Sequence, residues 1–257
     1  MELKLLDKKV IVTGGTQGLG LGLVRGFLEE GCRVAFCSRA DDNMRAVSDI
    51  LSVHADRYFS HVADVSSDAQ VAKFVEKAAK SLGGIDIVIN NAGGIERYGD
   101  FLDLDLDDWN QGWQTNFMSA VHMVRHAYPY LKESANGRIL NVSSITALQP
   151  GTFNPHYSAA KAALINFSKH LANRLAGDNI LVNTLVPGNF ESGGWNHYLA
   201  DFAKNHKMSP VEVEANQKQR VESGIPLGRM GTVEEIVPLV LLAASPVSAW
   251  MTGSCIV

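Results

Sequence analysis

Two side chains that could carry out acid–base chemistry stand four positions apart, Tyr157 and Lys161. If the segment that follows Pro155 is a helix, the phenol and the ammonium lie on one face, one turn apart. An ammonium beside a phenol favours the phenolate, so we expect the pKa of Tyr157 to lie below its ordinary value of about 10. A phenol of that kind can donate or accept a proton near neutral pH. The same spacing also fits an ordinary helix with an exposed tyrosine and lysine.

A hydroxyl precedes this pair. Ser144 stands at the end of the run Arg-Ile-Leu-Asn-Val-Ser-Ser, whose apolar residues predict a strand. A serine at the end of a strand, followed by a loop and then by the helix that carries Tyr157 and Lys161, would bring three polar groups together. The sequence therefore indicates one candidate site between this strand and this helix.

The elements that must position these groups begin with a glycine-rich loop. The sequence Thr-Gly-Gly-Thr-Gln-Gly-Leu-Gly occupies positions 13–20, between a β-branched run at 9–13 and a helical pattern at 18–30. Glycines let the backbone approach a pyrophosphate closely, and the N-terminus of the helix supplies N–H groups and a positive dipole. Any tight turn between a strand and a helix uses glycine, but this context favours a phosphate site.

The rest of the chain alternates strands with helices, which predicts an α/β fold with a doubly wound parallel sheet and helices on both faces. We expect a single domain over 1–257, and a variable substrate lid over about 188–225, the least periodic stretch. The expected strands are 9–13, 33–37, 58–62, 85–89, 137–142, 180–186 and 254–257. The expected helices are 18–30, 43–53, 67–82, 109–131 (possibly in two pieces) and 155–176, and a last one capped by Thr232 and Glu235 that contains Pro238.

Composition narrows the class of protein. The chain has 257 residues, 46% of them hydrophobic, and a net charge of −4, which gives no basic surface for nucleic acid. No signal peptide pattern appears, and the apolar run 237–244 is too short for a bilayer. We therefore expect a soluble cytoplasmic protein with neither membrane nor nucleic acid as partner. Cys32, Cys37 and Cys255 show no metal-ligand spacing, so we expect buried reduced thiols and no metal site.

Six motifs occur in one order along nearly the whole chain, and together they resemble a known family. They are Thr13-Gly-x-x-x-Gly-x-Gly20, Asn90-Asn-Ala-Gly93, Asn116, Ser144, Tyr157-x-x-x-Lys161 and Pro187-Gly188. The chain is similar to the short-chain dehydrogenase/reductase family in its single-domain form of about 250 residues. The resemblance implies a Rossmann-type sheet of about seven strands, a nicotinamide cofactor and the interconversion of an alcohol and a ketone.

The resemblance also implies roles for four catalytic residues. Tyr157 is the acid/base, Lys161 lowers its pKa and holds the nicotinamide ribose, and Ser144 orients the substrate oxygen. Asn116 supports a proton-relay water through its backbone. Ser144 is preferred over Ser143 because the family spacing to the tyrosine is thirteen, and Ser143 is then a structural residue at the end of the strand.

The cofactor site follows from the same resemblance, with Asn90 bracing the sheet rather than touching the ligand. Asp64 could instead only cap the next helix, and Ser192 stands where the family often has a threonine at the carboxamide. The implied cofactor-binding residues are Gly14, Thr16, Gln17, Gly18, Leu19, Gly20, Ser38, Arg39, Asp64, Val65, Asn91, Ala92, Gly93, Tyr157, Lys161, Pro187 and Gly188.

The residues after the second strand bear on the type of cofactor. An acidic residue there would bind the ribose 2′-hydroxyl of NAD, whereas this chain has Ser38 and Arg39. Arginine is a bidentate phosphate partner, so NADP (NADPH) is favoured and NAD is less favoured. Against this, Gln17 replaces a basic residue of many NADP-preferring relatives, and aspartates follow at 41 and 42. Arg39 could also stack on adenine or point to solvent.

The substrate is a small carbonyl or alcohol compound that the sequence does not identify: a 3-oxoacyl thioester, a sugar or polyol, a steroid or a small ketone. The alternatives are an NAD-dependent dehydrogenase, or a non-catalytic nucleotide-binding regulatory protein, which would not need the four catalytic residues. The candidate wall residues of the substrate site are Gly94, Ile95, Thr146, Phe153, His156, Trp195 and Tyr198.

The resemblance further implies a homo-oligomer, a tetramer or a dimer, with a tetramer built through the helices 109–131 and 155–176. Family members usually continue past the last strand with Asp-Gly-Gly or a similar sequence, whereas this chain stops at Cys255-Ile256-Val257. We therefore expect either a short C-terminus or a clipped chain, and the family's mode of subunit pairing is less firmly implied.

Overall fold

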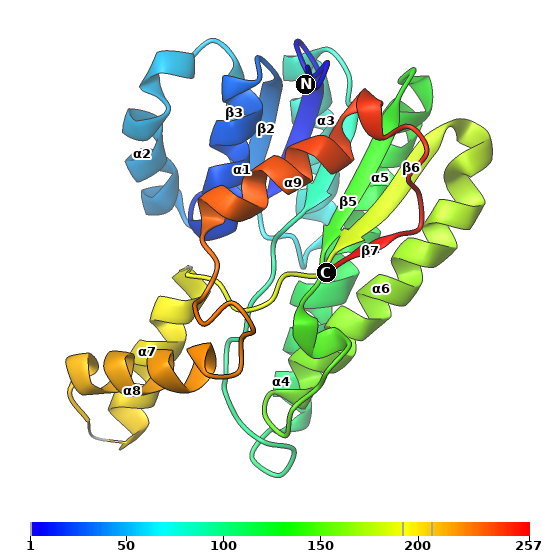
Figure 1. The fold of residues 1–257 in the computed structure, drawn as a ribbon. Coiled ribbons are helices and arrows are strands. Elements are labelled where there is room, and N and C mark those ends of the chain that lie inside the picture. Colours follow the sequence, from blue (N-terminus) through cyan, green and yellow to red (C-terminus); the bar gives the residue numbers. More distant parts are fainter. Residues whose placement is uncertain (1, 192, 207) are drawn as a thin grey trace.

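The computed structural model describes residues 2–191, 193–206 and 208–257. Within these residues the chain forms one parallel sheet of seven strands in the order β3-β2-β1-β4-β5-β6-β7 (Figure 1). The fold predicted from strand–helix alternation is confirmed. The strands are β1 (Lys9–Thr13), β2 (Arg33–Ser38), β3 (Tyr58–Val62), β4 (Ile87–Asn90), β5 (Gly137–Val142), β6 (Ile180–Leu185) and β7 (Cys255–Ile256).

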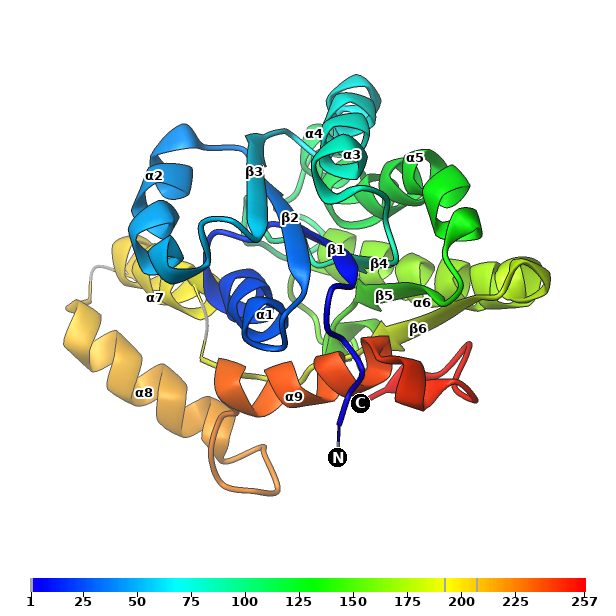
Figure 2. The same cartoon turned by 90° about the horizontal axis from the view of Figure 1, so that it is seen from above.

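Helices cover both faces of the sheet, as the view from above shows (Figure 2). The α-helices are α1 (Gly18–Glu29), α2 (Asp41–Ile50), α3 (Asp68–Leu82), α4 (Leu106–Trp113), α5 (Ser119–Glu133), α6 (Pro155–Leu175), α7 (Gly193–His206), α8 (Pro210–Glu222) and α9 (Val233–Ala244). Side chains of α1, α2 and α9 share one hydrophobic cluster, and side chains of α3, α5 and α6 share the other. None of the helices in the described ranges combines the length and hydropathy needed to cross a bilayer.

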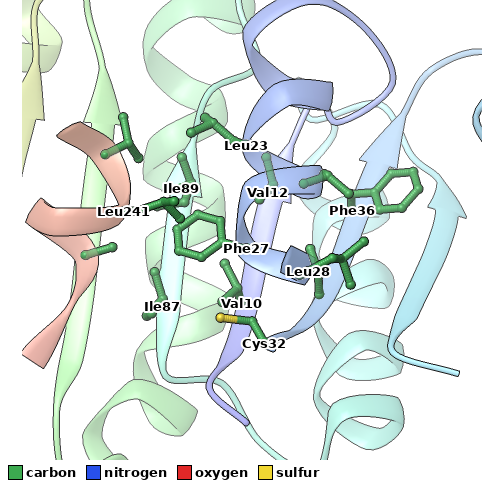
Figure 3. Close-up of a cluster of buried hydrophobic side chains, with 14 of the residues drawn as sticks. Val10, Val12, Leu23, Phe27, Leu28, Cys32, Phe36, Ile87, Ile89 and Leu241 are labelled. Carbon is green, nitrogen blue, oxygen red and sulfur yellow. The ribbon is translucent and has the colours of Figure 1, made fainter. Parts of the chain in front are cut away.

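Strand β1 shows why its sequence is a continuous apolar run. Val10 and Val12 point into the cluster beneath α1 and α9, whereas Ile11 points into the opposite cluster, and all three are fully buried. Successive side chains of a strand alternate between faces, so a sheet covered on both sides needs apolar residues at every position. Figure 3 shows Phe27 of α1 and Leu241 of α9 packed over this strand.

The strand order places a ligand crevice at the carboxyl end of β1. Strand β1 pairs with β2 on one side and with β4 on the other, so the connections that follow β1 and β4 leave in opposite directions. In open α/β sheets this switch point is where ligands bind. The loops that carry Gly14 and Asn91 therefore open toward the same space.

The segment 188–225 differs from the expectation of an aperiodic stretch. It contains helices α7 and α8, which project from the body at the carboxyl ends of the strands (Figure 1). Helix α8 begins at a capping box in which Ser209 and Glu212 bond each other's backbone N–H, with Pro210 as its first residue. Helix α8 is largely exposed, and only Val213 and Gln217 are buried on it, so it lacks the apolar stripe by which helices were predicted. Helix α7 does carry apolar residues at helical spacing, from Trp195 to Ala203, and the expectation overlooked this pattern.

Three smaller expectations are settled by the structure. The predicted helix 109–131 starts earlier, at Leu106, and passes through a π-helical turn, Gln114–Met118, between α4 and α5. The predicted capping box of Thr232 and Glu235 is confirmed at the start of α9. Cys32 and Cys37 are buried as predicted, but the prediction for Cys255 is wrong, because the short strand β7 leaves its side chain exposed.

Candidate active site

The glycine-rich loop joins β1 to α1 at the switch point. Gly14 has a φ of +67°, which lets the chain turn at once after the strand. A Cβ on Gly20 would collide with the Gly14 carbonyl oxygen, so only glycine lets the first turn of α1 approach the loop. The loop therefore presents backbone at the N-terminus of a helix, which is suited to a phosphate.

Hydrogen bonds tie this loop to the end of β4. The Thr13 hydroxyl accepts from the backbone N–H of Asn91 at 3.0 Å and from that of Ala92 at 2.9 Å. The Asn91 amide donates back to the Thr13 carbonyl at 2.9 Å. These contacts fix the two loops relative to each other, so the crevice between them is preformed.

Buried polar contacts align helix α6 on strand β5. The Asn90 amide donates to the Asn141 side chain at 2.7 Å, and Asn141 donates to Ser168 of α6 at 2.7 Å. Ser143 donates to the Lys161 carbonyl oxygen at 2.9 Å. These contacts are consistent with the structural roles expected for Asn90 and Ser143, and Ser143 also lines the cavity described below. These hydrogen bonds fix the position of α6 along its axis relative to the end of β5.

The three polar groups predicted from the sequence meet at this junction. Lys161, which is 3% exposed, donates to the Val142 carbonyl oxygen at 2.9 Å, and its Nζ lies 5.7 Å from the centroid of the Tyr157 ring. The Ser144 hydroxyl lies close enough to the Tyr157 hydroxyl to lower the pKa of the phenol. Helix α6 and the end of β5 therefore place a phenol, an ammonium and a hydroxyl side by side.

The expected lowering of the Tyr157 pKa is wrong for this structure. Burial of the phenol raises the pKa of Tyr157, and the hydrogen bond with Ser144 opposes this only in part. Burial also lowers the pKa of the Lys161 ammonium to about 8. The spacing of residues does not reveal this desolvation, which is the largest cause of the shift in the Tyr157 pKa. At neutral pH the phenol is protonated and the lysine is mostly cationic.

Asn116 lies in the π-helical turn and is 1% exposed. Its side chain accepts from the Gly94 N–H at 2.9 Å and donates to the Gly94 carbonyl at 2.9 Å, and it also donates to the Gly112 carbonyl at 3.0 Å. A Cβ on Gly93 would stand 2.8 Å from both Asn116 Oδ1 and Lys161 Nζ. Asn116 therefore lies behind the loop that follows β4 and holds it against Lys161.

A single cavity of about 650 Å³ collects nearly all the residues predicted from the sequence. Asn116 is the exception, since it lies behind the wall. The predicted catalytic and cofactor residues that line the cavity are Gly14, Thr16, Gln17, Gly18, Leu19, Gly20, Ser38, Arg39, Asp64, Val65, Asn91, Ala92, Gly93, Ser144, Tyr157, Lys161, Pro187 and Gly188.

Most of the predicted substrate-wall residues line this cavity. Of the predicted wall residues, Gly94, Ile95, Thr146, Trp195 and Tyr198 line it, whereas Phe153 is half exposed and His156 is buried beside a second, much smaller cavity. Ser192 lies outside the described residues. Trp195 and Tyr198 of α7 stack with centroids 5.5 Å apart, and Tyr198 meets Tyr98 at 5.6 Å.

Sequence reasoning missed several residues of the same cavity. Some of them lie in the loops after β4 and β6, where no motif marks them, and α8 brings Val221 in from a distance. The missed lining residues include Asn43, Glu96, Tyr98, Asn154, Asn189, Phe190, Val221 and Met230. Only Glu96 among these is charged, and it pairs with Arg39.

The residues present fit a dinucleotide. The glycine-rich loop offers backbone N–H groups and no carboxylate, while the far wall offers Asp64 and Arg39 for an adenosine. Lys161 and Tyr157 line the other end, so one extended ligand could touch both. Among the described residues, no group of three His, Cys, Asp or Glu side chains has an arrangement that could hold a metal ion.

Comparison with known proteins gives consistent matches. The model of the family described as short chain dehydrogenase matches residues 8–201. A 3-oxoacyl-acyl-carrier-protein reductase, FabG, of Chlamydia pneumoniae is 35% identical over 258 residues, covering 100% of this chain and 97% of the relative. L-sorbose reductase of Gluconobacter frateurii, solved with NADPH and L-sorbose, superposes with a TM-score of 0.91 at 28% identity and covers 100% and 96% of the two chains. An NADPH-bound short chain oxidoreductase of Pseudomonas aeruginosa is 35% identical with a TM-score of 0.83, covering 98% and 96%.

Proposed function

The chain belongs to the short chain dehydrogenase family, and from this premise we propose that it is an NADP(H)-dependent oxidoreductase that interconverts a secondary alcohol and a ketone. One observation carries the proposal. Ser144, Tyr157 and Lys161 line the same cavity as the glycine-rich loop, so a dinucleotide on that loop and a carbonyl at Tyr157 can occupy it together. A purely regulatory nucleotide-binding protein would not need these side chains together.

Each residue of the site has a separate role in the proposed reaction. A nicotinamide cofactor supplies or accepts the hydride when bound. In the reductive direction Tyr157 donates its proton to the carbonyl oxygen, and the Ser144 hydroxyl stabilises the charge on that oxygen by a hydrogen bond. Lys161 keeps a positive charge beside the phenolate that results. The Asn116 side chain holds the loop at Gly94, and we propose that its backbone supports a relay water.

The protonation state favours reduction at neutral pH. Because burial raises the pKa of Tyr157, the phenol carries its proton and is ready to act as a general acid. Oxidation of an alcohol needs the phenolate, which becomes more abundant as the pH rises. We therefore propose that ketone reduction is the direction the free enzyme is prepared for.

Part of the cavity wall supports an apolar substrate. Apolar and aromatic side chains that line the cavity offer contact area to an alkyl or aromatic group, and they are Ile95, Phe190, Trp195, Tyr198 and Met230. We propose a ketone with an apolar chain, with a 3-oxoacyl thioester as the first candidate. The similarity to FabG of Chlamydia pneumoniae supports this choice. A sugar is the second candidate, supported by the likeness to L-sorbose reductase.

The experiment is a substrate panel that follows NADPH absorbance. It contains 3-oxoacyl thioesters of increasing chain length, aryl ketones, and polar ketoses such as L-sorbose. We expect kcat/KM to rise with the size of the apolar group. Preference for the ketoses would support the second candidate, and the absence of turnover on every ketone and alcohol would contradict the proposed function.

The cofactor preference gives a prediction at Arg39. Replacing Arg39 by glutamine is expected to weaken NADPH binding by about 10- to 100-fold, because a charged hydrogen bond to the 2′-phosphate is lost. NADH binding should change by less than about threefold. Nicotinamide fluorescence gives both dissociation constants. The matched control is Arg45→Gln, which removes an exposed arginine of α2 that pairs with Asp41 at 2.7 Å. Equal losses for both cofactors would contradict the preference for NADP.

Two further expectations remain proposals. Helices α7 and α8 form the lid, since Trp195, Tyr198 and Val221 contribute to the cavity wall from this segment. The chain forms a homo-oligomer, a tetramer or a dimer, and the exposed apolar side chains near its C-terminal end support such pairing. These are Leu239, Leu242, Val247 and Trp250. Light scattering that shows a monomer would contradict the second expectation.

A further inference from the structure

Arg39 and Glu96 bridge the adenosine end of the crevice. Arg39 follows β2 and Glu96 lies in the loop after β4, and the two strands flank β1 on opposite sides. Arg39 Nη1 lies 2.8 Å from Glu96 Oε1, and both residues line the cavity that holds the glycine-rich loop. The ion pair therefore spans the crevice above the end of β1.

The guanidinium of Arg39, which would recognise a 2′-phosphate, is already paired with Glu96 in this structure. Among the described residues that line the cavity, Arg39 and Lys161 are the cations, and Lys161 belongs to the reactive end beside Tyr157. The nearby Arg45 already pairs with Asp41. A phosphate at the adenosine ribose must therefore draw on Arg39, which Glu96 holds in this structure.

We infer that Glu96 is a specificity-determining residue that competes with the 2′-phosphate of NADP for Arg39 and so moderates the preference of the enzyme for NADP over NAD. The inference rests on the proposed function, in which Arg39 binds that phosphate. NAD has no such phosphate, so it leaves the ion pair intact. Glu96 thus acts against one cofactor and is indifferent to the other.

The side chains of Arg39 and Glu96 are exposed enough for a 2′-phosphate to replace the Glu96 carboxylate at Arg39. The side chains of Arg39 and Glu96 are 59% and 42% exposed, so water screens their attraction and the pair is weak. A phosphate offers two negative charges and several acceptor oxygens to the guanidinium, so it can displace one carboxylate. The Glu96 carboxylate then remains close to the phosphate and repels it.

The test replaces Glu96 by glutamine, which keeps the size and removes the charge. Dissociation constants are measured by fluorescence for NADPH and NADH, and by calorimetry for 2′,5′-ADP and 5′-AMP, which differ only in the 2′-phosphate. In Glu96→Gln we expect NADPH and 2′,5′-ADP to bind about three- to tenfold more tightly, with NADH and 5′-AMP unchanged. The gain should shrink at high salt.

Two control variants test whether the effect is specific to the Arg39–Glu96 pair. Glu29→Gln removes the same charge from an exposed pair with Arg25 on α1, and it should change no constant. In the double variant Arg39→Gln/Glu96→Gln, the gain for 2′,5′-ADP should fall well below that of Glu96→Gln alone, because the competition needs Arg39.

The possible contrary results distinguish a failure of the inference about Glu96 from a failure of the NADP proposal. If Glu96→Gln leaves 2′,5′-ADP binding unchanged while Arg39→Gln weakens it, the role of Glu96 is overturned and the NADP proposal stands. If Glu96→Gln tightens 5′-AMP as much as 2′,5′-ADP, the carboxylate repels the nucleotide in general and the inference is overturned. If Arg39→Gln has no effect on NADPH, both the cofactor proposal and the inference fail.

Discussion

Replacing Tyr157 by phenylalanine is expected to lower kcat/KM for ketone reduction by about 10²- to 10⁴-fold, the usual contribution of a positioned general acid. The substitution removes the hydroxyl beside Ser144 and keeps the ring, whose centroid lies 5.7 Å from Lys161 Nζ. The cavity wall is otherwise unchanged, so the dissociation constant for NADPH should change by less than about threefold. Steady-state kinetics and cofactor titration separate the two effects.

A matched control removes a phenol hydroxyl elsewhere. Tyr128 on α5 donates to Asp178 at 2.9 Å and is not among the described residues that line the cavity. Tyr128→Phe should therefore retain kcat/KM within about twofold. If Tyr157→Phe keeps the activity of the parent enzyme, Tyr157 is not the proton donor, and the proposed mechanism is wrong.

Replacing Lys161 by methionine is expected to abolish most of the activity without a matching loss of stability. The phenolate that forms during reduction loses the positive charge beside it, so kcat/KM should fall by at least about 10²-fold. The free energy of unfolding changes less, because two effects oppose each other. The Val142 carbonyl oxygen loses its donor at 2.9 Å, which destabilises, and a buried charge disappears, which stabilises.

The pH dependence of stability isolates this buried charge. Burial lowers the pKa of Lys161 from its ordinary value of 10.5 to about 8 in the folded chain. Between these values the unfolded chain binds more protons than the folded chain, so the contribution of Lys161 to stability increases with pH. The free energy of unfolding of the parent enzyme, minus that of Lys161→Met, should rise by up to about 1.4 kcal/mol per pH unit above pH 8.

Urea titrations at pH 7.5, 8.5 and 9.5 measure this difference. The thiols of Cys32 and Cys37, whose pKa values burial raises to about 12, act in the opposite direction above pH 9, but both proteins share them. Lys169→Met is the control, since it removes an exposed lysine from the same helix instead of a buried one. A flat difference for Lys161→Met would mean that the buried lysine does not titrate as inferred.

Much of the candidate site could be predicted from the sequence, because its motifs reflect local requirements of the backbone, such as the tight turn after β1. The collision of a Cβ at Gly20 with the Gly14 carbonyl explains why the loop after β1 carries glycine at fixed spacing. The four-residue spacing of Tyr157 and Lys161 is that of one helical turn, and it places both in the wall of one cavity. Residues whose type is dictated by their immediate neighbours can be identified from the sequence.

The sequence by itself determined the alternation of strands and helices outside 188–225, the parallel sheet, and most of the residues that meet at its switch point. These follow from apolar periodicity and from local turn chemistry. Only the tertiary structure decided that burial raises the pKa of Tyr157, that the Asn116 side chain bonds the backbone of Gly94, and that Arg39 pairs with Glu96. Each of these depends on desolvation, or on a contact between segments far apart in the chain. Desolvation and contacts between distant segments cannot be read from the spacing of residues, because they arise only when the folded sheet brings distant loops to one edge.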